Sequence, residues 1–230
     1  LGNGARVGYP LGAMFGSRIA RDEDGNILVD GVGNYLADQV DEDGVLPFIG
    51  DPNPDFVMNY TNTFEYKGLS LGFAINHTSG GDIYSTTTAT LMGRGLTTDT
   101  ENRLSTYILP GVNINTGLPN DIQINNSNFY FDNGFASPAD ELSVYDGSVV
   151  RLREVNIAYS LPSKLLNKTP FGKVTIKASA FNMWYNAYNT PDGVNFDPNT
   201  TGLGAGNGQG FEFLTGPSSK RYGMSVNLSF

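Results

Sequence analysis

The 230-residue chain has no cysteine, a single histidine and a low share of charged residues, 16% of the sequence. Without cysteine there is no disulfide, no thiolate metal site and no cysteine nucleophile. The net charge of −9 argues against binding to nucleic acid or to an anionic membrane surface, because both attract basic proteins. No stretch approaches 18 consecutive apolar residues, which excludes a membrane-spanning helix on sequence grounds.

Motifs of common catalytic sites are missing as well. The one histidine, His77, has no Gly-x-Ser-x-Gly nucleophile turn to serve, and the sequence has neither a Walker motif nor a Gly-x-Gly-x-x-Gly loop. We therefore expect that the protein is not an enzyme and that His77 lies at the end of a strand.

What the sequence does contain is apolar and polar residues alternating with period two, in segments of about ten residues. That is the length a tilted strand needs to cross a bilayer. The clearest segment runs from Leu69 to His77 and follows a similar run that ends at Tyr66. The two runs are separated only by Lys67 and Gly68, which predicts a hairpin that pairs Tyr66 with Leu69 and puts both apolar sets on one face.

The segment 149–160 changes phase partway, because Leu152 is followed by Val155 rather than by another even-numbered apolar residue. A β-bulge near Arg153 and Glu154 would keep the apolar residues on one face. It would also keep the arginines off the lipid side, where a charge at the bilayer midplane costs about 2–4 kcal/mol.

Six such segments are expected, joined alternately by short and long connections, which is typical of outer-membrane barrels. We predict an all-β fold, a transmembrane antiparallel β-barrel, in which residues 1–230 supply about the last six strands. Six strands cannot close, since an open edge in lipid leaves backbone groups unpaired, so further strands would come from elsewhere. The predicted strands lie near 9–20, 54–66, 69–78, 148–160, 173–183 and 220–230, and the predicted external loops lie near 21–53, 79–147 and 184–219.

The alternation assigns side chains to surfaces. We expect one face of each strand to contact lipid and the other to line a wet lumen, with aromatic residues at the membrane interface. The terminal strand ends on an aromatic residue and resembles the signal that the barrel-assembly machinery reads. The lipid-facing candidates are Leu69, Leu71, Phe73, Ile75, Val174 and Ile176; the lumen-facing ones Glu65, Arg151, Arg153, Lys177 and Arg221; the aromatic girdle Trp184, Tyr185 and Tyr188; and the assembly signal Tyr222, Met224, Val226, Leu228 and Phe230.

Several blocks occur in order along nearly all of the chain, except about 86–145 and 200–215. They are Gly8-Tyr9-Pro10-Leu11-Gly12, Ile49-Gly50-Asp51-Pro52-Asn53-Pro54-Asp55-Phe56, Gly80-Gly81-Asp82-Ile83-Tyr84, Asp146-Gly147-Ser148-Val149-Val150-Arg151-Leu152-Arg153 and Phe181-Asn182-Met183-Trp184. Together they resemble the C-terminal part of SusC/RagA-like TonB-linked (TonB-dependent) outer-membrane transporters. One departure is Asp197-Pro198-Asn199, where the family often has Asp-Pro-Glu, and this puts a ligand role for that carboxylate in doubt.

The resemblance implies a plugged barrel of about 22 strands in the outer membrane of a Gram-negative, Bacteroidota-type bacterium. It implies TonB-dependent uptake of a large nutrient, an oligosaccharide or a peptide, with a SusD-like surface lipoprotein as lid. TonB would bind a region outside this chain, and the plug domain would also lie outside it. The barrel-assembly machinery and lipid or lipopolysaccharide are further expected partners; nucleic acid is not.

Two acidic clusters, Asp22-Glu23-Asp24-Gly25 and Asp41-Glu42-Asp43-Gly44, could bind Ca²⁺ through carboxylate oxygens. Neither has the glycine spacing of an EF-hand, and solvated loop turns explain them as well. We expect no cofactor beyond such a loop Ca²⁺.

Two other functions stay open at this stage. The barrel could be a structural or accessory subunit of a larger outer-membrane assembly or secretion complex. The alternation also fits a soluble carbohydrate-binding β-sandwich, whose strands bury one face.

Overall fold

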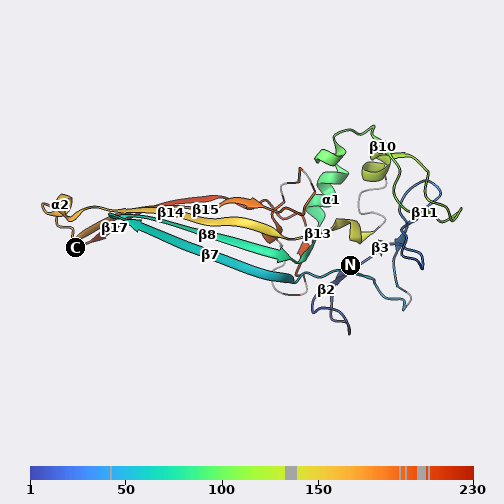
Figure 1. Ribbon diagram of the computed structural model, residues 1–230, viewed down its shortest axis with the longest axis horizontal. Coiled ribbons are helices and arrows are strands. Elements are labelled where there is room, and N and C mark those ends of the chain that lie inside the picture. Colours follow the sequence, from blue (N-terminus) through green and yellow to red (C-terminus); the bar gives the residue numbers. More distant parts are fainter. Residues whose placement is uncertain (42, 133–138, 192, 195, 201–205, 207) are drawn as a thin grey trace. The chain divides into compact units, whose positions relative to one another are not determined.

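The computed structural model describes residues 1–230 apart from 42, 133–138, 192, 195, 201–205 and 207. The chain folds into two compact units (Figure 1). The first, here called the sheet unit, comprises Asp55–Ser79, Ser148–Tyr188 and Pro217–Phe230. The second, here called the loop unit, comprises Leu1–Pro54, Gly80–Gly147 and Asn189–Gly216.

The sheet unit is built on one sheet of five long strands, in the order β17-β15-β14-β8-β7 (Figure 1). Strand β14 pairs antiparallel with β8 and with β15, and β15 pairs antiparallel with β17. A short helix, α2, lies between β14 and β15 in the sequence and contacts β15. The bounds are Pro54–Tyr66 for β7, Leu69–Gly80 for β8, Val149–Ser160 for β14, Ser163–Leu166 for α2, Lys173–Asn186 for β15 and Arg221–Ser229 for β17.

A two-residue turn joins β7 and β8, as the sequence predicted. Lys67 and Gly68 have φ values of 48° and 86°, and two successive positive φ angles are the signature of a type I′ turn. The Nδ2 of Asn76 donates a hydrogen bond of 3.0 Å to the Oδ1 of Asn59 on the opposite strand. These two residues are opposite each other in the register that pairs Tyr66 with Leu69, so the contact agrees with the predicted pairing.

The strands and helices of the loop unit are short. Its sheets have two or three strands, in the orders β1-β2-β6, β13-β9-β16, β10-β12, β11-β4 and β3-β5. The strands are β1 Gly2–Gly4, β2 Ala13–Phe15, β3 Arg18–Ile19, β4 Leu28–Val29, β5 Ala37–Asp38, β6 Phe48–Gly50, β9 Asp82–Ser85, β10 Thr106–Tyr107, β11 Val112–Asn113, β12 Ile124–Asn125, β13 Val144–Asp146 and β16 Phe211–Glu212. The helices are α1 Thr86–Gly93, the π-helix η2 Ser127–Asp132, and the 3-10 helices η1 Thr98–Thr100, η3 Asp140–Ser143 and η4 Pro198–Thr200.

Segments far apart in the sequence meet in the core of the loop unit. Met14, Ile49 and Phe211 form one buried cluster, and Ile83, Val194 and Phe196 form a second. The predicted loops 21–53, 79–147 and 184–219 are therefore largely folded against one another, which agrees with the rarity of long structureless loops in compact proteins.

The predicted strand near 9–20 is wrong. Only Ala13–Phe15 and Arg18–Ile19 are strands there, and they belong to the small sheets of the loop unit. Ala13 and Met14 are both 0% exposed, so both faces of β2 are buried and the alternation did not distinguish an inner face from an outer one. Gly8 and Gly12 have φ values of 89° and 77°, a conformation that interrupts an extended strand.

A buried carboxylate ties two parts of the loop unit together. Glu212 of β16 is 0% exposed, and its Oε2 accepts hydrogen bonds from the Thr87 N–H and the Ser85 hydroxyl, at 2.9 and 3.0 Å. Its Oε1 accepts from the Thr87 hydroxyl and from the N–H and hydroxyl of Thr215. The first turn of α1 is thus capped by an anion, which the helix dipole also favours. Burial raises the pKa of Glu212, but the hydrogen bonds from Thr87 and Thr215 outweigh it, so the pKa lies below its ordinary value.

Among the described residues, no helix is both long enough and apolar enough to pass through a membrane.

Candidate functional site: a two-faced sheet with a polar pocket

The sheet of the sheet unit has one apolar and one polar face, and the strand register keeps them separate. The predicted lipid-facing residues Leu69, Leu71, Phe73 and Ile75 of β8 lie opposite Tyr159, Ile157, Val155 and Leu152 of β14. The intervening residues Ser70, Gly72 and Asn76 lie opposite Ala158, Asn156 and Arg151. Cross-strand neighbours share a face, so the two sets extend across the sheet without mixing.

Aromatic contacts continue the apolar face onto β7. The ring of Phe73 lies 6.0 Å from that of Tyr60 and 6.3 Å from that of Phe64. The Asn62 side-chain amide donates a hydrogen bond of 2.9 Å to the Tyr60 hydroxyl. The polar Asn62 therefore has a partner on a face that is otherwise apolar.

The terminal strand β17 completes the apolar face at the other edge of the sheet. Tyr222, Met224, Val226 and Leu228 lie opposite Ala180, Ala178, Ile176 and Val174 of β15. Phe230 follows the strand, and its ring lies 5.3 Å from that of Phe171. The structure thus puts all five residues of the predicted assembly signal at one edge of the sheet, with side chains of β17 that are 48–77% exposed.

The apolar assignment needs one correction. Val174 has the orientation of Ile176, but it is only 8% exposed, whereas Ile176 is 38% exposed. Val174 lies at the end of β15 that α2 contacts, and Leu166 of α2 is also buried. Val174 is therefore packed within the protein, at a buried end of the sheet that also includes Leu166.

The bulge predicted in β14 is present. Leu152 is paired with Ile75 and Glu154 with Ala74, so Arg153 is an extra residue. Between the pairs Leu152–Trp184 and Glu154–Phe181, β15 contributes two residues, Asn182 and Met183, against this one. Asn182 has a φ of 53°, a left-handed conformation that asparagine tolerates better than most residues. Sequence reasoning missed this second irregularity, because β15 keeps the same alternation on both sides of it.

Four of the predicted lumen-facing residues share the polar face by register. Arg151 lies opposite Asn76, Lys177 opposite Ala158 and Ser225, and Arg221 opposite Phe181. Glu65 lies on the same face as Asn59 by alternation along β7. The fifth, Arg153, lines the same pocket as Arg221. Sequence reasoning did not include Glu154, which the bulge turns to this face.

The bulge lies beside a pocket of about 410 Å³ on the sheet unit. Its charged side chains are those of Arg153, Arg221 and Glu154. The Arg221 guanidinium lies 5.4 Å from the centre of the Phe181 ring, a cation–π contact that holds it over the strand. The lining residues are Asn59, Thr61, Ala74, Ile75, Arg153, Glu154, Phe181, Asn182 and Arg221.

The predicted aromatic girdle is wrong for one of its three members. Trp184 lies opposite Leu152 on the apolar face, whereas the next residue, Tyr185, lies opposite Arg151 on the polar face. The Arg151 guanidinium is 5.7 Å from the centre of the Tyr185 ring. Consecutive residues of a strand point to opposite faces, so Trp184 and Tyr185 cannot belong to one belt.

His77, at the end of the apolar alternation of β8, is part of an aromatic group that the sequence did not indicate. Its Nε2 is 3.0 Å from the hydroxyl of Tyr188, and the edge of its ring faces Phe56 at a centroid distance of 5.2 Å. Tyr188 is 45% exposed and Phe56 is 49% exposed. These three residues, together with Trp184, put a polar-edged aromatic group at one end of the sheet.

The first acidic cluster and the described residues Asp41, Asp43 and Gly44 of the second form turns, whereas Glu42 lies outside the described residues. The Oδ1 of Asp22 accepts hydrogen bonds from the backbone of Asp24 and Asn26, and the Oδ1 of Asp41 accepts from the backbone of Asp43 and Val45. The side chain and backbone of Asn26 hold the pKa of Asp22 below its ordinary value. A third turn, at Asp30, repeats the arrangement with Val32 and Asn34. The three turns share the pattern Asp-x-x-Gly, a short sequence repeat that sequence reasoning did not include.

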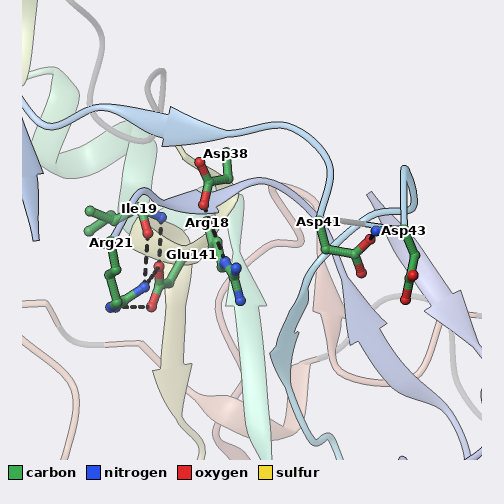
Figure 2. Close-up of polar contacts among 7 residues, drawn as sticks. All are labelled: Arg18, Ile19, Arg21, Asp38, Asp41, Asp43 and Glu141. Atoms are coloured by element: carbon green, nitrogen blue, oxygen red, sulfur yellow. Dashed lines mark hydrogen bonds and ion pairs between the residues drawn. The ribbon is translucent and has the colours of Figure 1, made fainter. Parts of the chain in front are cut away.

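Nearby carboxylates are paired with arginine (Figure 2). Arg21 lies 2.9 Å from Glu141, whose other oxygen accepts a hydrogen bond from the Ile19 backbone, and Arg18 lies 3.6 Å from Asp38. Within the described ranges, no group of three or more histidine, aspartate or glutamate side chains is arranged to hold a metal ion. Asp22, Asp30 and Asp41 accept hydrogen bonds within turns, and Asp38 and Glu141 form ion pairs with arginine.

Comparison with known proteins shows what the chain resembles. No protein-family model matches it. Two curated relatives are TonB-dependent receptors P3 and P26 of Formosa agariphila. The first is 25% identical over 210 residues, covering 91% of this chain and 19% of the relative; the second is 25% identical over 196 residues, covering 79% and 18%. The chain thus spans about a fifth of the length of these relatives.

The fold is similar to that of RagAB in solved structures. The peptide importer in its closed-closed and open-open states matches with TM-scores of 0.53 and 0.54 and sequence identities of 18% and 19%. A further RagAB peptide transporter structure matches with a TM-score of 0.55, over 97% of this chain and 23% of the other. The resemblance to SusC/RagA-like TonB-dependent receptors, expected from the sequence blocks, is confirmed by these comparisons.

Proposed function

We propose that the sheet unit is part of the wall of a transmembrane β-barrel in the outer membrane of a Bacteroidota-type bacterium. The whole protein would import a large nutrient, an oligosaccharide or a peptide, in a TonB-dependent manner. The observation that carries the proposal is the separation of faces, with exposed apolar side chains on one side and a polar, charged surface on the other. Lipid would contact the first face and the wet lumen the second.

The dimensions of the apolar face fit a bilayer. On β7 it extends from Phe56 to Tyr66, ten steps along the strand, or about 34 Å at roughly 3.4 Å per step. A strand tilted by about 40° would span about 26 Å along the membrane normal, close to the apolar band of about 25 Å in outer-membrane barrels. Aromatic residues lie at both ends of this span, as at the two interfaces of such barrels.

The exposure of the apolar face argues against a soluble β-sandwich. Met224 is 77% exposed, Val226 54% and Leu228 48%, and the described part of the sheet unit contains one sheet. A sandwich would bury this face against a second sheet. Hydrocarbon is the solvent in which such a surface is favourable.

The sheet has two edges, β7 and β17. In a bilayer both would need partners, because unpaired backbone groups in hydrocarbon cost several kcal/mol each. We propose that other strands of the whole protein close the barrel, to about 22 strands as in large plugged transporters. This is consistent with the share of about a quarter of the RagAB chains that the match covers.

Partners are proposed on the same basis. The likeness to a peptide importer supports an import role, and the family resemblance adds a SusD-like surface lipoprotein, TonB and the barrel-assembly machinery. For the last, we propose that β17 offers the recognition edge, since a strand edge with an apolar face can be extended by β-augmentation.

Deletion of the gene in the bacterium that carries it, followed by complementation, tests the proposal. A functional importer predicts loss of growth on one class of oligosaccharide or peptide as sole nutrient, with growth on its monomers retained. The tagged protein should fractionate with the outer membrane, require detergent for extraction and co-purify with a surface lipoprotein. Secretion or barrel-assembly components as the main co-purifying proteins, with normal nutrient uptake, would instead support an accessory subunit. A detergent-free soluble protein would contradict the barrel.

A further inference from the structure

Glu154 shares a face with the two arginines of the pocket only because of the bulge. In a regular strand, Glu154 would point to the side opposite Arg151 and Arg153. The extra residue Arg153 changes the phase, so Glu154 lies opposite Ala74 and lines the pocket together with Arg153. Bulges often re-aim a side chain beside a functional site, and here the bulge concentrates charge at one point of the wall.

Among the described residues, neither Arg153 nor Arg221 of the pocket forms an ion pair with a carboxylate. The ion pairs of Arg6, Arg18 and Arg21 all lie in the loop unit. Glu154 lines the pocket, yet it forms no ion pair with Arg153 or Arg221, and its Oε1 accepts a hydrogen bond of 3.2 Å from Asn156 instead. Guanidinium groups are the side chains best suited to bind an oxyanion through two parallel hydrogen bonds.

The charge of the whole chain is divided unequally between the two units. The sheet unit has nine lysine and arginine residues against three acidic ones, a net charge of +6, whereas the loop unit has five against twenty, a net charge of −15. A chain with a net charge of −9 thus keeps a surplus of cations on the unit that contains the pocket. Fixed cations in a lumen attract anions and select for them.

We propose that the pocket of Arg153 and Arg221 is a binding subsite for an oxyanion, a carboxylate or a sulfate carried by the imported molecule. Arg221 is held in place by Phe181, and the side chains of Thr61 and Asn59 add neutral polar groups to the lining. The volume of about 410 Å³ admits such a group together with part of the molecule that bears it. That the anion is part of the cargo rests on the proposed function, whereas the oxyanion site itself rests on the pocket alone.

Binding of sulfate and of acetate to the purified full-length receptor, measured by titration calorimetry at constant ionic strength, tests the site. The variants are R153Q, R221Q and the double variant, and the matched control is K177Q, which removes a cation from the same face outside the pocket. Each single variant is expected to weaken sulfate binding about tenfold and the double variant to abolish it, since charge-assisted hydrogen bonds contribute strongly. K177Q is expected to bind sulfate as the wild type does. Heat-dependent mobility in gels confirms that each variant forms a folded barrel.

Two results would overturn the site. Equal sulfate binding by the wild type and the folded double variant would show that the arginines bind no anion. An equal loss in K177Q would show a general effect of charge rather than a subsite. If the wild type binds neither ion while the arginine variants lower thermal stability, the guanidiniums are occupied by another part of the protein, and the proposal fails. A gene deletion without any uptake defect would contradict the import function while leaving the sulfate result standing, so the two failures are distinguishable.

Discussion

Asn76 of β8 donates a hydrogen bond of 3.0 Å from its Nδ2 to the Oδ1 of Asn59 on β7. Asn76 is 5% exposed and lies opposite Arg151 on its other side. This side-chain bond between β8 and β7 lies on the polar face and supports the register of the hairpin. A slip by one residue would move every side chain of β7 to the wrong face, so this contact protects the separation on which the proposed function depends.

The two-residue turn between β7 and β8 can be tested by a substitution that strains its backbone. Gly68 has a φ of 86°, and a Cβ there would lie 2.8 Å from the Ser160 backbone oxygen. Gly68→Val should therefore slow folding and lower the folded fraction, at a cost of about 1–2 kcal/mol for the left-handed conformation alone. Lys67→Asn is the matched control and should fold at least as well, because asparagine followed by glycine favours a type I′ turn. Heat-dependent gel mobility during refolding in detergent measures both; equal behaviour of the two variants would contradict the assigned turn.

The bulge can be tested at Asn182, whose φ is 53°. Asn182→Val should destabilise the folded barrel by about 1–2 kcal/mol, because a β-branched residue is strained in the left-handed region. Asn182→Gly should be tolerated there, although it loses the hydrogen bond to the Ser219 backbone oxygen. The unfolding midpoint in guanidinium, measured from the folded gel band, separates the two; a regular strand at this position would reverse their order.

Stability of the loop unit should fall in acid because of Glu212. Its pKa in the folded protein lies below the ordinary value of 4.5, so the carboxylate stabilises the fold above that pH. The contribution is lost as the pH falls from about 4.5 through the folded pKa. Glu212→Gln should remove about 3 kcal/mol at neutral pH, since donors of Thr87 and Thr215 lose their charged acceptor.

Limited proteolysis of the loop unit between pH 7 and pH 3 measures this effect. The wild type should become susceptible below about pH 4.5, whereas Glu212→Gln should be susceptible throughout. Asp121→Asn, which changes an exposed acid of the same unit, should follow the wild type. An acid transition unchanged by Glu212→Gln would exclude Glu212 as its cause.

Much of the sheet could be predicted because its chemistry is local. Period-two alternation, the two-residue turn and the phase change at Leu152 and Val155 are all visible in the sequence, and each follows from the geometry of a strand. The β15 irregularity was not visible, since the alternation from Ala180 to Trp184 is undisturbed and only the backbone of Asn182 reveals it.

The loop unit could not be predicted for a different reason. Its cores join residues such as Met14 and Phe211, nearly two hundred positions apart, and no local pattern encodes that contact. The segment 9–20 alternates as a membrane strand would, but Ala13, Met14 and Phe15 are all buried, whereas Leu11 is 81% exposed. Period-two alternation indicates an extended strand, but it does not indicate whether a face contacts lipid, water or another part of the protein.

A lysine scan on adjacent residues tests the cost of charge on each face. Phe73→Lys should lower the folded fraction strongly, because a lysine at the midplane on the lipid side costs about 2–4 kcal/mol. Ala74→Lys lies on the opposite, polar face beside the pocket and should fold nearly as well as the wild type. Folded and unfolded gel bands after refolding into lipid vesicles give both fractions; comparable losses for the two would contradict a lipid-facing Phe73.

The central claim, that the two faces of the sheet meet lipid and water, is tested most directly by spin labels along β8. This chain has no cysteine, so a thiol placed in turn at positions 70–76 introduces a label at a known site. In the native outer membrane, labels at 71, 73 and 75 should be relaxed by oxygen, which concentrates in lipid, and labels at 70, 72, 74 and 76 by a water-soluble nickel complex. Accessibility without this period of two, or with all seven labels shielded from both reagents, would contradict the account.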